Sequence, residues 1–202
     1  IGSHDAMNMG LALAAGDIIG FLNTDDIYAE GCFRDVARYF VEHPQSQAVR
    51  GTALFFETDT RGQHLITGEL RHYREEDQLW GELLFGAPGF NSWFFRRSVF
   101  RDDLPFDTAF YIAADRDFLI RAVIGGLKPD SIPQPLYFYR RHDRSATIDR
   151  SGRQSLEILG EHIRIATKFL ANPAVPRNHA RRLAAWKAFE TYQLFRLELR
   201  NQ

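Results

Sequence analysis

Two adjacent carboxylates, Asp25 and Asp26, follow a short apolar run at residues 18–22 and are the strongest local signal of chemistry in the sequence. Neighbouring carboxylates repel each other unless a cation or hydrogen-bond donors compensate them. Mg²⁺ and Mn²⁺ suit this role, because in proteins they keep one or two carboxylates beside phosphate oxygens. The alternative is that one aspartate caps the next helix. The pair therefore predicts a metal site, with a helix cap as the competing interpretation.

A further aspartate, Asp115, stands at the start of a helix predicted over residues 113–124. It is either a general base aimed into a cleft or a negative charge that stabilises the N-terminus of the helix. The helix pattern does not choose between these roles. Asp117 precedes Arg121 by four residues, so we expect these two to form a structural ion pair on the outer face of the helix.

Basic side chains gather after a strand predicted over residues 135–139, namely Arg140, Arg141, His142 and Arg144. The planar guanidinium group suits a diphosphate, and neutral histidine is a common metal ligand. A solvated, charged loop is the competing interpretation for any one of these residues.

The elements that position these residues are predicted from apolar periodicity and turn residues. A helix over 5–15, with Gly16 as its C-cap, leads into the apolar run, which is typical of strands buried on both faces of a parallel sheet. This order is the second half of a βαβ unit and places residues 23–26 at the carboxyl end of a strand, where open α/β sheets bind ligands. The remaining elements are predicted as helices over 31–43, over 113–124 and in two stretches after Arg153, and as strands over 48–57, 63–70, 91–97 and 135–139.

Composition and charge limit the class of protein to which this sequence can belong. The formal net charge of −1 provides no global field for nucleic acid, so no nucleic-acid partner is expected. The single cysteine, Cys32, excludes an internal disulfide and a cysteine-built zinc site. No apolar run reaches the roughly 18 to 20 residues that cross a bilayer, and no secretory signal stands at the start. We therefore expect a soluble cytoplasmic protein. Ile1 is not an initiator and the chain opens inside a predicted helix, which indicates a fragment that has lost an N-terminal segment.

Together, these segments resemble a family 2 glycosyltransferase. The similar stretches follow the family's order and cover residues 1–150 of this sequence. Residues 5–10 and 15–26 correspond to the donor-site helix with the DxD motif, and residues 90–97 correspond to the acceptor-side strand. Residues 114–121 correspond to the catalytic-base helix, and residues 139–142 correspond to the closing loop. Asn23 replaces the first aspartate of the motif.

The resemblance implies an α/β fold of the GT-A (Rossmann-like) type, with a mixed sheet flanked by helices over residues 1–150 and a helical C-terminal extension over 151–202. The first strands, which in this family clasp the nucleotide base, are missing from the sequence. The fold is therefore expected to be incomplete at its N-terminus, and the fragment to bind donor weakly and to be inactive on its own.

The resemblance also implies the reaction and its central residues. An inverting enzyme of this family moves a sugar from a nucleotide-diphosphate sugar to a hydroxyl of a glycan or lipid-linked saccharide, assisted by Mn²⁺ or Mg²⁺. Asp115 falls on the base that deprotonates the acceptor, and Asp25 falls on the metal ligand, with Asp26 in support. His142 is implied to touch the metal or the diphosphate.

Four further residues are implied to contact the donor. Asp5 and Asn8 match the donor-side helix, and Arg140 and Arg141 lie in the loop that faces the diphosphate. Met9 replaces the family's usual basic residue, which weakens one donor contact.

Two other functions compete with this interpretation. A non-catalytic nucleotide- or sugar-binding subunit would keep the fold without the reaction. A metal-dependent nucleotidyltransferase would use similar carboxylates but release pyrophosphate. The basic, amphipathic helix after residue 176 is expected to pack on its own domain or in a homodimer, and a peripheral contact with the inner membrane face is the alternative.

Overall fold

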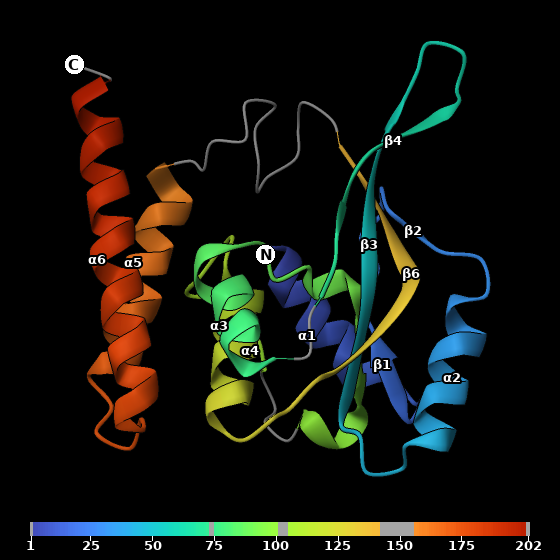
Figure 1. Cartoon of the computed structure of the whole chain (residues 1–202), viewed down its shortest axis with the longest axis horizontal. Coiled ribbons are helices and arrows are strands. Elements are labelled where there is room, and N and C mark those ends of the chain that lie inside the picture. Colours follow the sequence, from blue (N-terminus) through green and yellow to red (C-terminus); the bar gives the residue numbers. More distant parts are fainter. Residues whose placement is uncertain (1, 73–74, 101–104, 142–155, 201–202) are drawn as a thin grey trace.

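The computed structural model describes residues 2–72, 75–100, 105–141 and 156–200, which form a mixed sheet with helices on both faces (Figure 1). In these residues the sheet has six strands, with β1, β5, β3, β6 and β2 in spatial order and β4 paired to the second half of β3. The strands are β1 Ile18–Gly20, β2 Ile27–Tyr28, β3 Ala48–Thr58, β4 His64–Leu70, β5 Trp93–Arg96 and β6 Asp130–Arg140. The mixed α/β sheet expected from the sequence is confirmed.

Strand direction decides which loops share an edge of the sheet. β3 and β6 are parallel, with Val49 beside Asp130 and Phe56 beside Arg140. β1 and β3 are each antiparallel to β5, so β1 runs in the same direction as β3. The loop after β1 and the ends of β3 and β6 therefore lie at the same edge.

The apolar run at residues 18–22 does not form the doubly buried parallel strand that its composition predicted. β1 pairs with β5 in the antiparallel sense, and Ile19 is the buried residue of its three. Leu22 is 52% exposed. The reason is that β1 lies at the border of the described sheet, where part of its side-chain surface has no neighbouring strand.

The helices agree closely with the periodicity. They are α1 Ser3–Leu13, α2 Cys32–Glu42, α3 Glu76–Phe85, α4 Ala114–Ile124, α5 Leu156–Leu170 and α6 Arg177–Arg200, with short 3₁₀ turns η1 Phe90–Ser92 and η2 Arg97–Val99. Sequence reasoning missed α3 and β2. The apolar positions of α3 have helical spacing, at Leu79, Trp80, Leu83 and Leu84, so that signal was present. β2 exists through its pairing with β6, a contact that no local pattern encodes.

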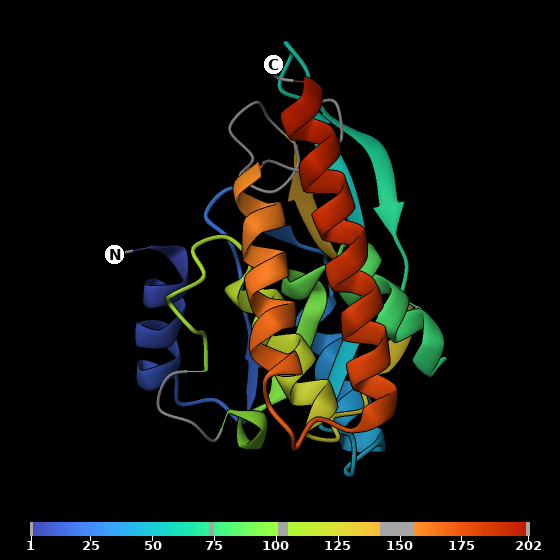
Figure 2. The same cartoon turned by 90° about the vertical axis from the view of Figure 1, so that its left-hand side faces the viewer.

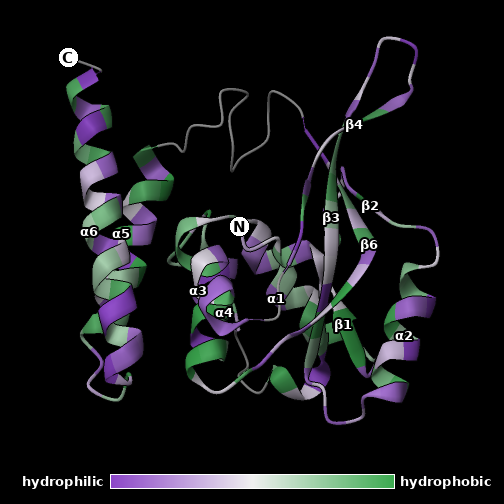
Figure 3. Ribbon diagram, viewed as in Figure 1, coloured by the Kyte–Doolittle hydropathy of each residue, from purple (hydrophilic) through white to green (hydrophobic). Residues whose placement is uncertain are grey.

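Successive side chains along the strands point to opposite faces of the sheet and so form two apolar layers. Val49 and Phe94 face α2, where Cys32, Val36 and Phe40 are buried. The neighbouring residues Ala48, Trp93 and Phe95 belong to a larger cluster on the other face. Figure 1 shows α2 alone on one side of the sheet and α1, α3 and α4 on the other. Hydrophobic and hydrophilic segments alternate along α2, as expected for a helix with one buried side (Figure 3).

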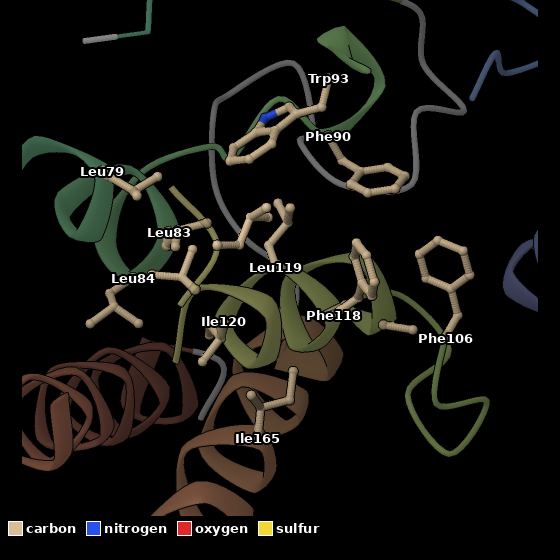
Figure 4. Close-up of a cluster of buried hydrophobic side chains, with 14 of the residues drawn as sticks. Leu79, Leu83, Leu84, Phe90, Trp93, Phe106, Phe118, Leu119, Ile120 and Ile165 are labelled. Carbon is tan, nitrogen blue, oxygen red and sulfur yellow. The ribbon is translucent and has the colours of Figure 1, made fainter. Parts of the chain in front are cut away.

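The C-terminal helices α5 and α6 form a third layer that shares this larger core. Ile165 of α5 points toward α4, where Phe118, Leu119 and Ile120 are buried (Figure 4). Trp186 of α6 is fully buried in the same cluster. Figure 2 shows α5 and α6 side by side in front of the other elements. Helices from the C-terminal end of the chain thus support α4.

No helix in the described part of the chain is both long enough and apolar enough to cross a bilayer.

Candidate active site

The loop with Asp25 and Asp26 and the helix with Asp115 can be placed relative to the ends of the sheet. Asp25 and Asp26 lie in the loop after β1, at the edge where β3 and β6 finish. α4 leads through Gly125 and Gly126 into the beginning of β6, so its first turn, with Asp115, is directed toward the opposite end, where β6 finishes (Figures 1 and 2). The fold therefore directs the DxD-like loop and the start of α4 toward a common edge.

Asp26 is a hydrogen-bonded carboxylate inside this edge. It is 8% exposed, and its Oδ2 accepts hydrogen bonds from the Tyr137 hydroxyl at 2.6 Å and from Asn23 Nδ2 at 2.9 Å. Its Oδ1 accepts a bond from the backbone N–H of Arg140 at 2.7 Å. Both oxygens are therefore committed to tying the loop after β1 onto the end of β6.

The Tyr137 hydroxyl remains a donor in this arrangement. Burial raises its pKa above the ordinary value, and the hydrogen bond to Asp26 raises it further. The same oxygen accepts a hydrogen bond from Asn91 Nδ2 at 2.8 Å. Sequence reasoning identified neither Tyr137 nor Asn91 as part of the site, because their partners lie far away along the chain.

Asn91 connects the loop after β1 to α4. It lies in η1 between the buried residues Phe90 and Ser92. The Phe90 ring packs against Phe118 of α4 with 6.2 Å between centroids. A continuous path of hydrogen bonds and ring contacts thus joins Asp26 to the helix that carries Asp115.

Asp25 differs from its neighbour because its side chain is exposed. Its backbone oxygen accepts a hydrogen bond from Arg140 Nε at 3.0 Å. The guanidinium of Arg140 also lies over the Phe56 ring at 5.1 Å and donates to Thr58 Oγ1 at 3.3 Å. Arg140 is therefore held beside the Asp25 loop by three contacts.

Arg141 and the α1 residues are placed differently. The Arg141 guanidinium lies over the Phe55 ring, whereas that of Arg140 lies over the Phe56 ring. Successive residues of a strand face opposite sides of the sheet, so the two arginines turn toward different faces. Asp5 accepts a hydrogen bond from the backbone N–H of Gly2, the N-cap residue of its own helix. Asn8 is buried and exchanges two hydrogen bonds with the backbone of Phe106, at 2.9 and 3.1 Å. The predicted metal ligand His142 lies outside the described residues.

Asp115 is half-buried in the first turn of α4, where its Oδ1 accepts a hydrogen bond from Arg116 N at 2.7 Å. Arg116 points inward: its guanidinium donates to the carbonyls of Leu83 and Gly86 and lies near the Trp186 ring. Burial lowers the pKa of this arginine. Arg116 thus fastens the helix to α3 and α6.

The ion pair expected between Asp117 and Arg121 exists, with 3.3 Å between Oδ2 and Nη2, but its predicted location is wrong. The Asp117 side chain is fully buried rather than on an outer face. The reason is that α5 packs there and supplies a second cation, Lys168, at 2.9 Å.

The acidic residues of this site can hold a divalent metal ion in one way. In the described part of the chain, no group of three or more histidine, cysteine or acidic side chains could enclose a metal. Both oxygens of the buried Asp26 accept hydrogen bonds, whereas Asp25 is an exposed residue of the same loop. Mg²⁺ and Mn²⁺ are commonly held by one carboxylate together with substrate phosphates. The site is therefore compatible with an ion that Asp25 holds jointly with a diphosphate.

The hydrogen bond from Tyr137 to Asp26 yields a testable expectation. Tyr137→Phe should lower the free energy of unfolding by about 1 to 3 kcal/mol, because it removes one donor from a buried carboxylate. Urea unfolding measures this loss. Tyr28→Phe is a matched control, since the buried Tyr28 hydroxyl has no hydrogen-bond partner among the described residues. Equal effects of the two substitutions would mean that the bond to Asp26 does not stabilise the fold.

Comparison with known proteins identifies the family. The family model described as Glycosyl transferase family 2 matches residues 2–103, which is more than half of the chain. The chain belongs to glycosyl transferase family 2. The resemblance seen in the sequence is thereby confirmed. The match includes α1, the Asp25 loop and η1, and it ends before α4.

Solved structures of another protein share the fold of this family 2 chain. Residues 1–349 of S. aureus TarS align with a TM-score of 0.61 and 15% identity, over 97% of this chain and 53% of that one. The same protein in complex with UDP-GlcNAc aligns with a TM-score of 0.59 and 14% identity, over 95% and 53%. The GT-A-like fold is therefore confirmed.

A curated sequence relative is more similar over a shorter stretch. The minor teichoic acid biosynthesis protein GgaB of Bacillus subtilis (strain 168) is 33% identical over 73 residues, which are 36% of this chain and 8% of GgaB. The family 2 chain thus spans about half the length of the TarS 1–349 structures and a small part of GgaB.

Proposed function

We propose that this chain forms the catalytic part of an inverting glycosyltransferase that moves a sugar from a nucleotide-diphosphate sugar to a hydroxyl of a saccharide or lipid-linked acceptor. One observation carries the proposal. In a family 2 chain, the loop with the exposed residue Asp25 and the first turn of α4 with Asp115 lie toward the same end of the sheet. The first suits a cation on the donor diphosphate, and the second suits a base.

The donor is proposed to be a uridine-diphosphate sugar, and the product an envelope polymer. The support is indirect: TarS, which shares the fold, was solved with UDP-GlcNAc, and GgaB is a teichoic acid biosynthesis protein. A teichoic acid, whose repeating units carry free hydroxyl groups, is the corresponding class of acceptor.

The reaction requires one proton transfer and one displacement. The Asp115 carboxylate takes the proton of the acceptor hydroxyl while that oxygen forms a bond to the anomeric carbon of the sugar. The bond from the anomeric carbon to the diphosphate oxygen breaks, and its electron pair leaves with the nucleoside diphosphate. Attack opposite to the leaving group inverts the configuration.

The chain's own residues hold the charges involved. Asp25 is exposed and would hold a Mg²⁺ or Mn²⁺ ion, which would neutralise the departing phosphates. The Arg140 guanidinium, held beside this loop, adds positive charge at the same place. Asp26 keeps the loop in position through Tyr137 and the backbone of Arg140.

The full-length protein should release UDP when it is incubated with UDP-GlcNAc, Mn²⁺ and purified teichoic acid. We expect one UDP for each sugar transferred, inverted anomeric configuration by NMR, and loss of transfer when the metal is chelated. Release of pyrophosphate would instead identify a nucleotidyltransferase. Donor binding without any release of UDP would identify a non-catalytic binding subunit.

A further inference from the structure

We infer that Glu161, in α5, is a positioning residue for Asp115: it holds the backbone from which α4 begins. The inference rests on the proposed role of Asp115 as the base. It concerns the C-terminal helices, for which the proposed chemistry gives no other task.

Glu161 accepts three backbone hydrogen bonds from consecutive residues. Its Oε1 accepts from Tyr111 N at 2.7 Å, and its Oε2 accepts from Ile112 N at 2.9 Å and from Ala113 N at 2.8 Å. The residue is 6% exposed. A buried carboxylate is costly unless donors compensate it, and here backbone N–H groups at a helix start do so.

This carboxylate holds the segment that leads into α4, at a helix start that has no side-chain cap from its N-cap residue. Ala113 is the N-cap residue of α4, and no side chain of that segment caps the helix. Helix N-termini leave N–H groups unsatisfied, and a serine, threonine or aspartate normally accepts a bond from one of them. Glu161 instead satisfies the N–H groups that lead into the helix, from another element 48 to 50 residues away.

A second contact from α5 holds the other end of the same segment. Lys168 lies two turns after Glu161, and its Nζ contacts Asp107 Oδ2 at 2.8 Å and Asp117 Oδ1 at 2.9 Å. Figure 2 shows the segment before α4 between α1 and α5. From the α1 side, Asn8 holds the backbone of Phe106. Residues 106–113 are therefore fastened on both sides.

Asp115 follows the last of these held amides by two residues, so its position depends on them. A general base must lie within about 2.6 to 3.2 Å of the proton it removes. A misplacement of about 1 Å can lower the rate about 10²-fold. Glu161→Gln keeps the size of the side chain but replaces one acceptor oxygen with an NH₂ group, which cannot accept the backbone N–H bonds on its side.

The test compares full-length variants by hydrogen exchange and by kinetics with UDP-GlcNAc, Mn²⁺ and teichoic acid. Glu161→Gln should increase amide exchange in peptides that contain residues 111–113. It should also lower kcat about 10- to 100-fold while the donor KM changes less than about twofold. Glu157→Gln is the matched control, because this exposed glutamate lies one turn earlier on α5. It should change neither measurement.

The outcomes separate the inference from the proposed function. If Asp115→Asn abolishes transfer but Glu161→Gln retains wild-type kcat, positioning by Glu161 is wrong and the proposed function stands. If Asp115→Asn is fully active, the proposed role of Asp115 as the base fails, and the inference that rests on it fails with it. If Glu161→Gln does not fold, Glu161→Asp replaces it, because the shorter side chain keeps the charge but withdraws the carboxylate from the three N–H groups. A wild-type kcat in that variant would also overturn the inference.

Discussion

Asp115→Asn should lower the rate of sugar transfer about 10²- to 10⁴-fold and leave the affinity for UDP-GlcNAc nearly unchanged, because a positioned base contributes about this factor. The substitution keeps the size of the side chain and an oxygen that can accept the bond from Arg116 N. It removes the ability to take a proton. UDP release measures the rate, and calorimetry in the presence of Mn²⁺ measures the affinity.

The control for this experiment is Asp35→Asn. Asp35 lies in the first turn of α2, so it matches Asp115 in residue type and helix position but is on the other side of the sheet. Its substitution should leave the rate unchanged. A turnover close to wild type in Asp115→Asn would show that this aspartate is not the base.

Asp25→Ala should remove most of the affinity that Mn²⁺ adds to donor binding. Loss of even an outer partner of a metal ligand costs about 10- to 100-fold in metal affinity, so loss of a direct ligand is expected to cost at least as much. The loop itself should survive, because its attachment depends on Asp26, Tyr137 and Arg140. Calorimetry with UDP-GlcNAc, with and without Mn²⁺, measures the difference.

Two comparisons make this result specific. Glu30→Ala removes another exposed carboxylate close to β2 and should leave the Mn²⁺ effect intact. Thermal unfolding of Asp25→Ala should match that of the unmodified protein. If Asp25→Ala binds donor with the same dependence on Mn²⁺, the ion is held elsewhere and the metal role of this loop must be abandoned.

The positions of the candidate residues along the chain followed from local sequence. Periodicity placed the helix of Asp115 within one residue of its observed start, and the glycine and apolar run after α1 located the loop of Asp25 and Asp26. These signals are local because side chains three or four residues apart share a helix face, and a short apolar run marks a strand.

The division of roles within the site did not follow from local sequence. Asp25 and Asp26 are adjacent and chemically identical, yet one is exposed and the other is buried. The difference arises because β6 brings the Tyr137 hydroxyl and the Arg140 amide to Asp26 from 111 and 114 residues away. No pattern within a few residues of the pair contains this information.

The same reasoning applies to the C-terminal helices. Composition and periodicity were enough to predict α5 and α6 and their amphipathic character. In sequence, Glu161 is one of several acidic residues on such a helix. It holds the start of α4 because α5 packs against α4 and buries the carboxylate over three N–H groups. Local sequence thus decided which segments are helix, strand and loop, whereas tertiary packing decided which carboxylates meet solvent and which meet backbone amides, since burial and partners depend on segments that are distant along the chain.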